Sequence, residues 1–228
     1  MTVCLLVMTD GRRALLENTI ASLTGHLPDG LVARSILHDD SGDEHHRAWL
    51  RDRFGTEFEV TWPAAERAGQ GAAIRSAWRQ VSRHVDVDVR HVLHIEDDYL
   101  FHDLPLAAMI DLLDAHPHLR QVALLRQPWF RRERDAGGVF AAHPGEYMQR
   151  ADQRGRAWVE HIRHWTFNPC VYPAALCRAG YIDGARHELR YGQRLVAENT
   201  KARFAYYGRL DDEPRVEHRG TERVGSGY

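Results

Sequence analysis

Apolar runs of strand length alternate with helical segments through the first half of this 228-residue chain, and this alternation restricts the fold more than any other feature. Residues 3–8 form a continuous apolar run, and residues 13–23 carry apolar side chains at helical spacing. We expect further strands at 31–37, 58–62, 91–95 and 121–125, and further helices at about 43–54, 71–83 and 105–116. A βαβαβ order of this kind predicts an α/β fold, with a mainly parallel sheet covered by helices on both faces.

The alternation breaks after residue 127. Residues 129–160 are rich in arginine, glycine and polar residues and show little periodicity, so we expect a long loop or irregular insertion. Beyond it we expect strands at 165–172 and 204–207, helices at 173–179 and 186–198, and an extended tail at 216–228. The length of the chain suits one domain, 1–228, which the break divides into 1–127 and 128–228.

Composition excludes several classes of protein. The chain is 43% hydrophobic and 27% charged, which is typical of a globular domain, and its net charge of −2 argues against a generic nucleic-acid binder. The apolar start is too short for a signal peptide or a membrane span, so we expect a cytoplasmic protein without membrane insertion. Three cysteines in apolar surroundings favour buried, reduced thiols: Cys4, Cys170 and Cys177.

An acidic triplet, Glu96, Asp97 and Asp98, directly follows the apolar run 91–95. Side chains alternate along a strand, so we expect Glu96 and Asp98 on one side and Asp97 on the other. Converging carboxylates repel unless a cation lies between them, and their oxygens suit Mg²⁺ or Mn²⁺ with substrate phosphates as further ligands. The carboxyl edge of a parallel sheet is also where open α/β folds bind ligands. The alternative is a solvated acidic turn.

Two more segments are expected near the same edge. Asp39 and Asp40 follow the second strand, where a carboxylate can accept hydrogen bonds from a base or ribose, or form an Asx turn and helix cap. Gly71 and Arg75 belong to a glycine-bearing loop that leads into a helix, and backbone amides and a cation there suit a phosphate. This loop follows the third expected strand, not the first, which weakens an NAD-binding interpretation.

Two late residues complete the candidate set. Glu188 lies at the start of a helix and is a candidate general base for an acceptor hydroxyl, or a glutamate that stabilises the helix dipole. His218 lies on a short expected strand and is a candidate metal ligand through a ring nitrogen, or a structural histidine.

The order of these residues resembles the GT-A fold of nucleotide-sugar glycosyltransferases, in particular the family-2-like enzymes. The resemblance implies a metal-dependent transferase with a donor half at 1–127 and an acceptor half at 128–228. Glu96 and Asp98 fill the outer positions of the DxD motif of these enzymes, with glutamate in place of the commoner first aspartate. The implied ligands of Mn²⁺ or Mg²⁺ are Asp98 and His218. The nucleotide-diphosphate sugar would be bound by Thr9, Asp39, Asp40, Gly71, Arg75, Glu96 and Asp97.

The same resemblance implies that Glu188 is the catalytic base of an inverting reaction, although the Glu-Asp pair usual before this position is absent. Several stretches are also similar to glycosyltransferases encoded by bacteriophages of high-GC hosts: 94–101, 116–129, 166–172, 211–220 and 225–228. This narrower resemblance implies an enzyme of the host cytoplasm that modifies a virion protein or modified DNA.

The acceptor is less constrained by the sequence than the donor. Aromatic and amide side chains are candidates for contact with the sugar or acceptor, with core packing as the alternative: Trp129, Trp165, Asn168 and Tyr172. Arginines concentrate in residues 126–163, where they would form either a patch that binds DNA or a solvated loop. The balanced overall charge favours a protein acceptor. A nucleotidyltransferase and a non-catalytic nucleotide-sugar-binding module are the alternative functions.

Overall fold

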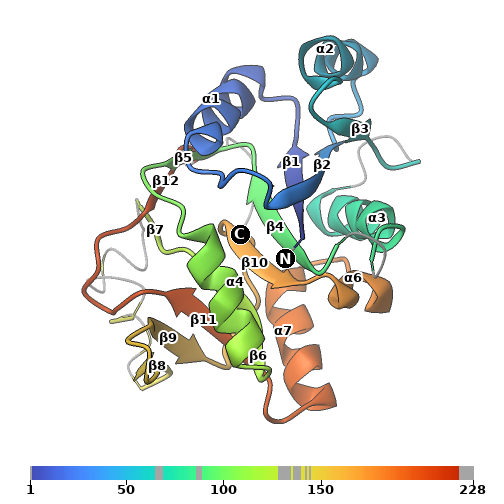
Figure 1. Cartoon of the computed structure of the whole chain (residues 1–228). Coiled ribbons are helices and arrows are strands. Elements are labelled where there is room, and N and C mark those ends of the chain that lie inside the picture. The colour runs from blue at the N-terminus through green and yellow to red at the C-terminus, as the bar shows by residue number, and fades with distance from the viewer. Residues whose placement is uncertain are drawn as a thin grey trace.

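The computed structural model describes residues 2–64, 69–85, 89–127, 135, 140–141, 143 and 145–220. Its strands are β1 (Val3–Thr9), β2 (Val32–Asp39), β3 (Glu59–Thr61), β4 (His91–Glu96), β5 (Tyr99–Phe101), β6 (Leu119–Ala123), β7 (Arg126–Gln127), β8 (Tyr147–Ala151), β9 (Ala157–His161), β10 (Cys170–Pro173), β11 (Arg203–Tyr207) and β12 (Val216–His218). Its helices are α1 (Arg13–Thr24), α2 (Glu44–Phe54), α3 (Gln70–Ser82), α4 (Leu106–Ala115), α6 (Ala175–Ala179) and α7 (His187–Glu198). A large sheet has the order β3-β2-β1-β4-β10-β6-β11-β9-β8, and a small sheet the order β5-β12-β7 (Figure 1).

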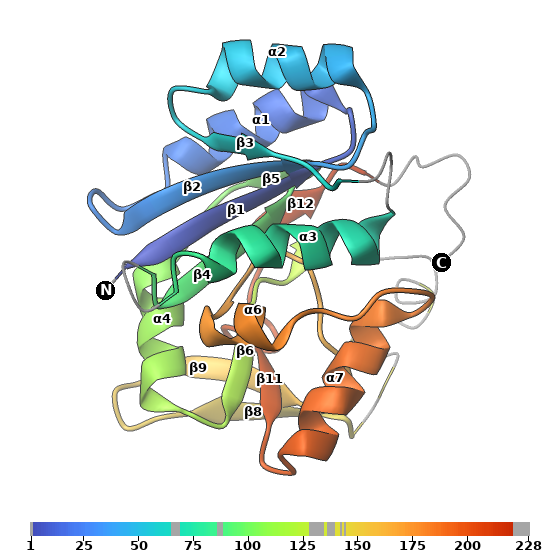
Figure 2. The ribbon, with the colours of Figure 1, turned by 90° about the vertical axis from the view of Figure 1, so that its right-hand side faces the viewer.

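Helices cover both faces of the large sheet, as the alternating sequence predicts. Alternate residues of β1, beginning with Val3, join a core with α1, α2 and α4, and the intervening residues, beginning with Cys4, join a core with α3, α6 and α7. In Figure 2 the strands β1 and β2 pass between α1 and α3. Because successive side chains of a strand point to opposite faces, an unbroken apolar strand such as β1 requires cover on both. The three cysteines are buried and free, as predicted.

The start of α2 follows its sequence signal closely. Asp43 is the N-cap, and its side chain accepts a hydrogen bond from the backbone N–H of His45 at 2.8 Å. This bond satisfies one of the amides that have no partner within the first turn of a helix. The cap fixes where the chain turns after β2 and therefore where residues 39–41 lie.

The core between α3, β10 and α7 is built around the indole of Trp78. This ring lies 5.1 to 6.1 Å, centroid to centroid, from the rings of Trp165, Tyr172, Tyr181 and Tyr191. Trp165 and Tyr172 have no exposed surface. Core packing, the alternative considered for these two residues, therefore accounts for both of them, and neither ring is open to an acceptor in this structure.

Gly192 allows α7 to approach this aromatic core. A Cβ atom at this position would lie 2.6 Å from the backbone nitrogen of Trp165, closer than real Cβ contacts come. We expect Gly192→Ala to lower the free energy of unfolding by roughly 1–3 kcal/mol, the usual cost of overpacking a rigid core. Urea denaturation would measure this, with Gly25→Ala as the control because a Cβ there meets no atom within 4 Å. Equal stability of the two variants would contradict the close approach.

The second half of the sheet departs from a purely parallel pattern. β10 lies between β4 and β6 and is antiparallel to both, whereas β11 is parallel to β6. The strand expected at 165–172 is wrong over most of its length, since pairing begins only at Cys170. The side-chain amide of Gln121 takes the place of a neighbouring strand at Thr166: it donates to the backbone oxygen at 2.7 Å and accepts from the N–H at 3.1 Å.

The irregular insertion expected at 129–160 is also wrong in part. β8 and β9 form an antiparallel hairpin that extends the sheet beyond β11. Most residues of β8 are exposed, so no apolar run announces the strand. Trp129 and most of residues 128–144 lie outside the described residues, and so does 221–228, the end of the expected extended tail.

The small sheet joins the end of the described chain to the segment that follows the acidic triplet. β12 is antiparallel to β5, which places His218 opposite Tyr99, and it is parallel to β7. None of the helices in the described ranges has the length and apolar content needed to cross a membrane.

Candidate functional site

The carboxyl ends of β1, β2 and β4 meet at one edge of the large sheet. The strands end level with one another, with Thr9 beside Asp39 and Met8 beside Glu96. The backbone N–H of Asp40 donates to the carbonyl of Thr9 at 2.9 Å and continues this pairing. A pocket of about 210 Å³ opens at this edge and is lined by Met8, Thr9, Asp10, Arg12, Asp40, Gly69, Gln70, Ala73, Glu96 and Asp97. Four of the predicted donor-binding residues therefore share one pocket: Thr9, Asp40, Glu96 and Asp97.

Asp97 is held firmly within this edge. Its Oδ2 accepts a hydrogen bond from Thr9 Oγ1 at 2.8 Å and another from the backbone N–H of Asp10 at 3.2 Å. Its Oδ1 forms an ion pair with the guanidinium of Arg12, which also pairs with Asp98 Oδ2 at 2.6 Å. Burial raises the pKa of Asp97 to about 6, although Arg12 acts in the opposite direction.

The expected alternation of the acidic triplet is wrong. Asp97 and Asp98 both reach Arg12, whereas Glu96 accepts a hydrogen bond from Gln70 of α3 at 2.5 Å. The physical reason is that β4 ends at Glu96 and the next two residues form a turn, where the two-residue period of a strand no longer applies. The triplet therefore presents its carboxylates in two directions around the pocket.

The electrostatics of this edge concentrate negative charge. Burial, together with the neighbouring charges of Asp98 and Glu188, raises the pKa of Glu96 to about 8, although the hydrogen bond from Gln70 acts in the opposite direction. Burial opposes ionisation of Asp98 too, but its hydrogen bond to His218 and the charge of Arg12 outweigh burial and lower its pKa. An anion cluster of this kind is stabilised by any cation that can enter it.

His218 reaches the acidic edge because β12 pairs with β5. Its Nε2 lies 3.4 Å from Asp98 Oδ2, and its ring lies 5.0 Å from that of Tyr99. Asp98 Oδ1 is buried, and among the described residues it has no hydrogen-bond partner. One carboxylate and one imidazole fit a divalent cation whose other ligands are waters and substrate phosphates. The described part of the chain contains no group of three His, Cys, Asp or Glu side chains that would hold a metal alone.

The two aspartates after β2 have different environments. Asp39 is fully buried and accepts hydrogen bonds from Ser41 N–H at 3.1 Å, Ser41 Oγ at 2.9 Å and Arg47 Nε at 3.1 Å. These bonds realise the Asx turn that was the structural alternative for this segment. Asp40 is the member of the pair that lines the pocket.

Gly71 and Arg75 lie beside the pocket but do not line it. A Cβ at Gly71 would lie 2.9 Å from Asp183 Cα, so the glycine permits α3 to contact the segment before α7. Arg75 forms a half-exposed ion pair with Asp183 at 2.6 Å. The residues of this loop that do line the pocket are Gly69, whose φ of 79° suits glycine, and Gln70. Gln70, Asp10 and Arg12 line the pocket but were not predicted from the sequence. For Asp10 and Arg12, the sequence signal that could have found them is the Asp-Gly-Arg turn after the first strand.

Glu188 lies in the first turn of α7, whose start contacts the start of α3 (Figure 2). The side chain is partly buried, and its negative charge is one of the causes that raise the pKa of Glu96. Arg186 precedes it with φ at 55°, the left-handed region that non-glycine residues rarely adopt. His187 shares a hydrogen bond of 2.8 Å with the hydroxyl of Tyr181. These contacts fix the direction in which α7 begins, and they bring Glu188 close enough for its charge to act on Glu96.

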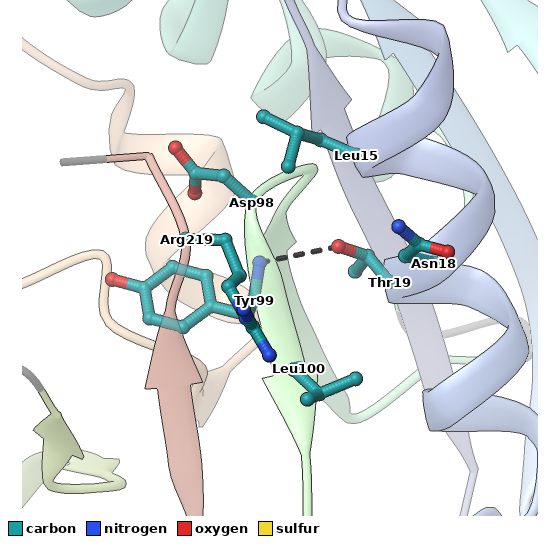
Figure 3. Close-up of a pocket in the computed structure, with 7 residues that line it drawn as sticks. All are labelled: Leu15, Asn18, Thr19, Asp98, Tyr99, Leu100 and Arg219. Carbon is teal, nitrogen blue, oxygen red and sulfur yellow. Dashed lines mark hydrogen bonds between the residues drawn. The ribbon is translucent and has the colours of Figure 1, made fainter. Parts of the chain in front are cut away.

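A second pocket, of about 360 Å³, lies on the other side of Asp98 between α1 and β5 (Figure 3). The N–H of Tyr99 donates to Thr19 Oγ1 at 3.1 Å and ties β5 to α1 along its floor. The hydroxyl of Tyr99 donates to Asn168, a predicted acceptor contact, at 3.0 Å. Asp98 therefore lines this second pocket, and its ion pair with Arg12 connects it to the first.

Solved structures match this chain in shape, whereas no family model and no curated protein matches its sequence. The structure of S. aureus TarS 1–349 covers 96% of this chain and 60% of its own length, with a TM-score of 0.58 and 14% identity. GalNAc-T7, solved with UDP, GalNAc and Mn²⁺, covers 96% of this chain and 43% of its own length, with a TM-score of 0.64 and 10% identity.

The chain has a GT-A-like glycosyltransferase fold. This confirms the predicted fold class, including the mainly parallel sheet with helices on both faces. Identity of 10 to 14% establishes the fold alone, and the chain spans less than two thirds of each of these relatives.

Proposed function

We propose that this chain is a glycosyltransferase that moves a sugar from a nucleotide-diphosphate donor to an acceptor hydroxyl. The observation that carries the proposal is the edge at the ends of β1, β2 and β4, where Asp40, Glu96 and Asp97 line one pocket and Arg12 of that pocket pairs with both Asp97 and Asp98. TarS has been solved with UDP-GlcNAc and with UDP, and GalNAc-T7 with UDP, GalNAc and Mn²⁺, so proteins of this fold bind such donors. A nucleoside diphosphate and a carboxylate-bound cation suit the size and charge of this edge.

Each residue of the pocket then has a role that its position supports. Asp40 accepts hydrogen bonds from the nucleoside, and Thr9 lies beside the base. Asp98 and His218 hold Mn²⁺ or Mg²⁺, which when bound neutralises charge on the departing diphosphate. Glu96, held by its hydrogen bond from Gln70, faces the transferred sugar or the ribose of the nucleotide. Glu188 removes the proton from the attacking hydroxyl, which gives an inverting reaction.

The acceptor that we propose is a protein hydroxyl, with modified DNA as the alternative. Described arginines of the 126–163 region pair with carboxylates: Arg150 with Glu160 at 3.6 Å, Arg156 with Asp152 at 2.5 Å, and Arg163 with Glu146. Paired arginines contribute little net charge to a phosphate-binding surface. Binding of DNA would weaken steeply with salt, so acceptor binding that varies little between 50 and about 200 mM salt supports a protein.

Donor binding tests the proposal directly. We expect one nucleotide-diphosphate sugar in a panel to raise the melting temperature in the presence of Mn²⁺. A ligand at ~100 times its dissociation constant contributes about 2.7 kcal/mol, which is a readily measured shift. Asp40→Asn should reduce the shift, and Asp29→Asn, a loop aspartate before β2 that does not line the pocket, should leave it unchanged. No shift with any donor would overturn the proposal in favour of another ligand.

A further inference from the structure

Arg12 forms ion pairs with the buried carboxylates of Asp97 and Asp98, and it lines the pocket of about 210 Å³ together with Asp97. We propose that Arg12 is the resting counter-ion of this site: it competes with the divalent cation for Asp98 and turns to the donor diphosphate when that cation binds. This inference rests on the proposed function. In this arrangement Arg12 couples the binding of the metal to the binding of the donor.

Arg12 balances the charge of two neighbouring carboxylates. Asp97 is fully buried and Asp98 is 4% exposed, and the two are adjacent in sequence. Two ionised carboxylates in such a position are costly unless a cation is bound to them. Each takes one terminal nitrogen of the Arg12 guanidinium, so a single side chain neutralises the pair before any ligand arrives.

The Arg12 guanidinium also carries an unused hydrogen-bond donor. Arg12 Nε is buried and, within the described residues, has no hydrogen-bond partner. A buried N–H without an acceptor is costly, and an oxygen-rich ligand entering the pocket would supply one. The planar guanidinium matches phosphate oxygens, which is why arginine binds them with two bonds rather than one.

Apart from these ion pairs, the fold does not depend on the Arg12 side chain. Arg12 is the N-cap residue of α1, but its side chain makes no capping hydrogen bond. Its backbone belongs to the turn that joins β1 to α1, beside Gly11 with φ at 82°. The side chain is 22% exposed and therefore has an opening towards the pocket.

Competition for Asp98 follows from the distances. Asp98 Oδ2 lies 2.6 Å from an Arg12 nitrogen and 3.4 Å from His218 Nε2. A divalent cation bound to the same carboxylate would repel the guanidinium at contact distance. A donor diphosphate carries enough negative charge to pair with the cation and with the Arg12 guanidinium at once. The cation and the donor should therefore bind together more tightly than either binds alone.

Gly220 closes this ion pair on the side of the chain end. Its N-terminal neighbour Arg219 donates a backbone hydrogen bond to the carbonyl of Asp98 at 2.7 Å. A Cβ at Gly220 would overlap Asp98 Oδ2 and lie 3.1 Å from Arg12 Nη1. The absence of a side chain at Gly220 therefore lets the backbone lie directly against the pair.

The experiment measures binding of Mn²⁺ alone, by the loss of the free-ion signal in electron paramagnetic resonance. Arg12→Ala should bind Mn²⁺ at least about tenfold more tightly than the wild type, and should bind a nucleoside diphosphate with Mn²⁺ about tenfold more weakly, as charge pairs at contact commonly require. Arg13→Ala is the matched control, since Arg13 is exposed and contacts His45 and His46 instead. Arg12→Gln keeps more of the side chain but also removes the charge, so it should show the same two changes. It replaces Arg12→Ala in the experiment if the alanine variant does not fold.

An unchanged or weaker Mn²⁺ affinity in both Arg12 variants would overturn the inference. A purely structural role predicts that result, because loss of a structural contact loosens the site for both ligands. The proposed function fails separately, if the wild type binds no nucleotide-diphosphate sugar with Mn²⁺. Tighter Mn²⁺ binding by the Arg12 variants would support the counter-ion role in either case.

Discussion

Asp98→Asn is expected to reduce sugar transfer by about 10²- to 10³-fold, the loss typical when one preorganised charge-stabilising group is removed from an active site. The variant keeps the shape of the side chain and removes its charge, so a cation at this position loses its carboxylate ligand. Asp98 Oδ1 is buried without a partner among the described residues, and Oδ2 is shared by Arg12 and His218. The measurement is the initial rate of transfer at saturating donor with Mn²⁺.

Two controls separate this effect from misfolding. Arg12 retains Asp97 as a partner in the variant, so the melting temperature should fall only modestly. Asp103→Asn removes a half-exposed carboxylate that pairs with Arg215 after β5, and it should transfer as the wild type does. If Asp98→Asn kept its rate both with Mn²⁺ and with a chelator, the metal-dependent mechanism would be wrong.

The sequence predicted this edge of the sheet well because its elements are local. β1 is an unbroken apolar run, β2 and β4 are apolar over most of the residues before their ends, and polar residues follow each of them, as at Thr9, Asp40 and Glu96. Strand order then follows from short connections and brings those ends to one edge. This is why Asp39 and Asp97, 30 and 88 positions from Thr9, could be placed beside it from the sequence.

The features that sequence reasoning missed depend on contacts between distant segments. The direction of Asp97 depends on where β4 ends, and the role of Arg12 depends on two carboxylates 85 and 86 residues away. β8 lacks an apolar period because most of its side chains are exposed, so only its pairing with β9 defines it. An indole such as that of Trp165 can stack on a sugar, but here it packs against Trp78 of α3, which the sequence around Trp165 does not indicate.

Glu188→Gln is expected to reduce transfer by about 10²- to 10⁴-fold, the usual contribution of a positioned general base, while binding of the donor stays within a few fold of the wild type. Glutamine is nearly the same size but cannot accept the proton of the acceptor hydroxyl. The substitution also removes a negative charge that raises the pKa of Glu96, so the pKa of Glu96 should fall in the variant. Measuring the rate and the donor affinity together separates catalysis from binding.

Glu198→Gln is the matched control, because Glu198 lies at the other end of α7 and forms an exposed ion pair with Arg194 at 2.8 Å. It should leave the rate unchanged, whereas loss of the first-turn charge in Glu188→Gln should cost about 0.3–1 kcal/mol of stability through the helix dipole. Retained transfer in Glu188→Gln would overturn the assignment of the base. Loss of donor binding together with transfer would instead mean that Glu188 shapes the pocket. An inverted anomeric centre in the product of the wild type, read by nuclear magnetic resonance, is the result that a single base on α7 requires.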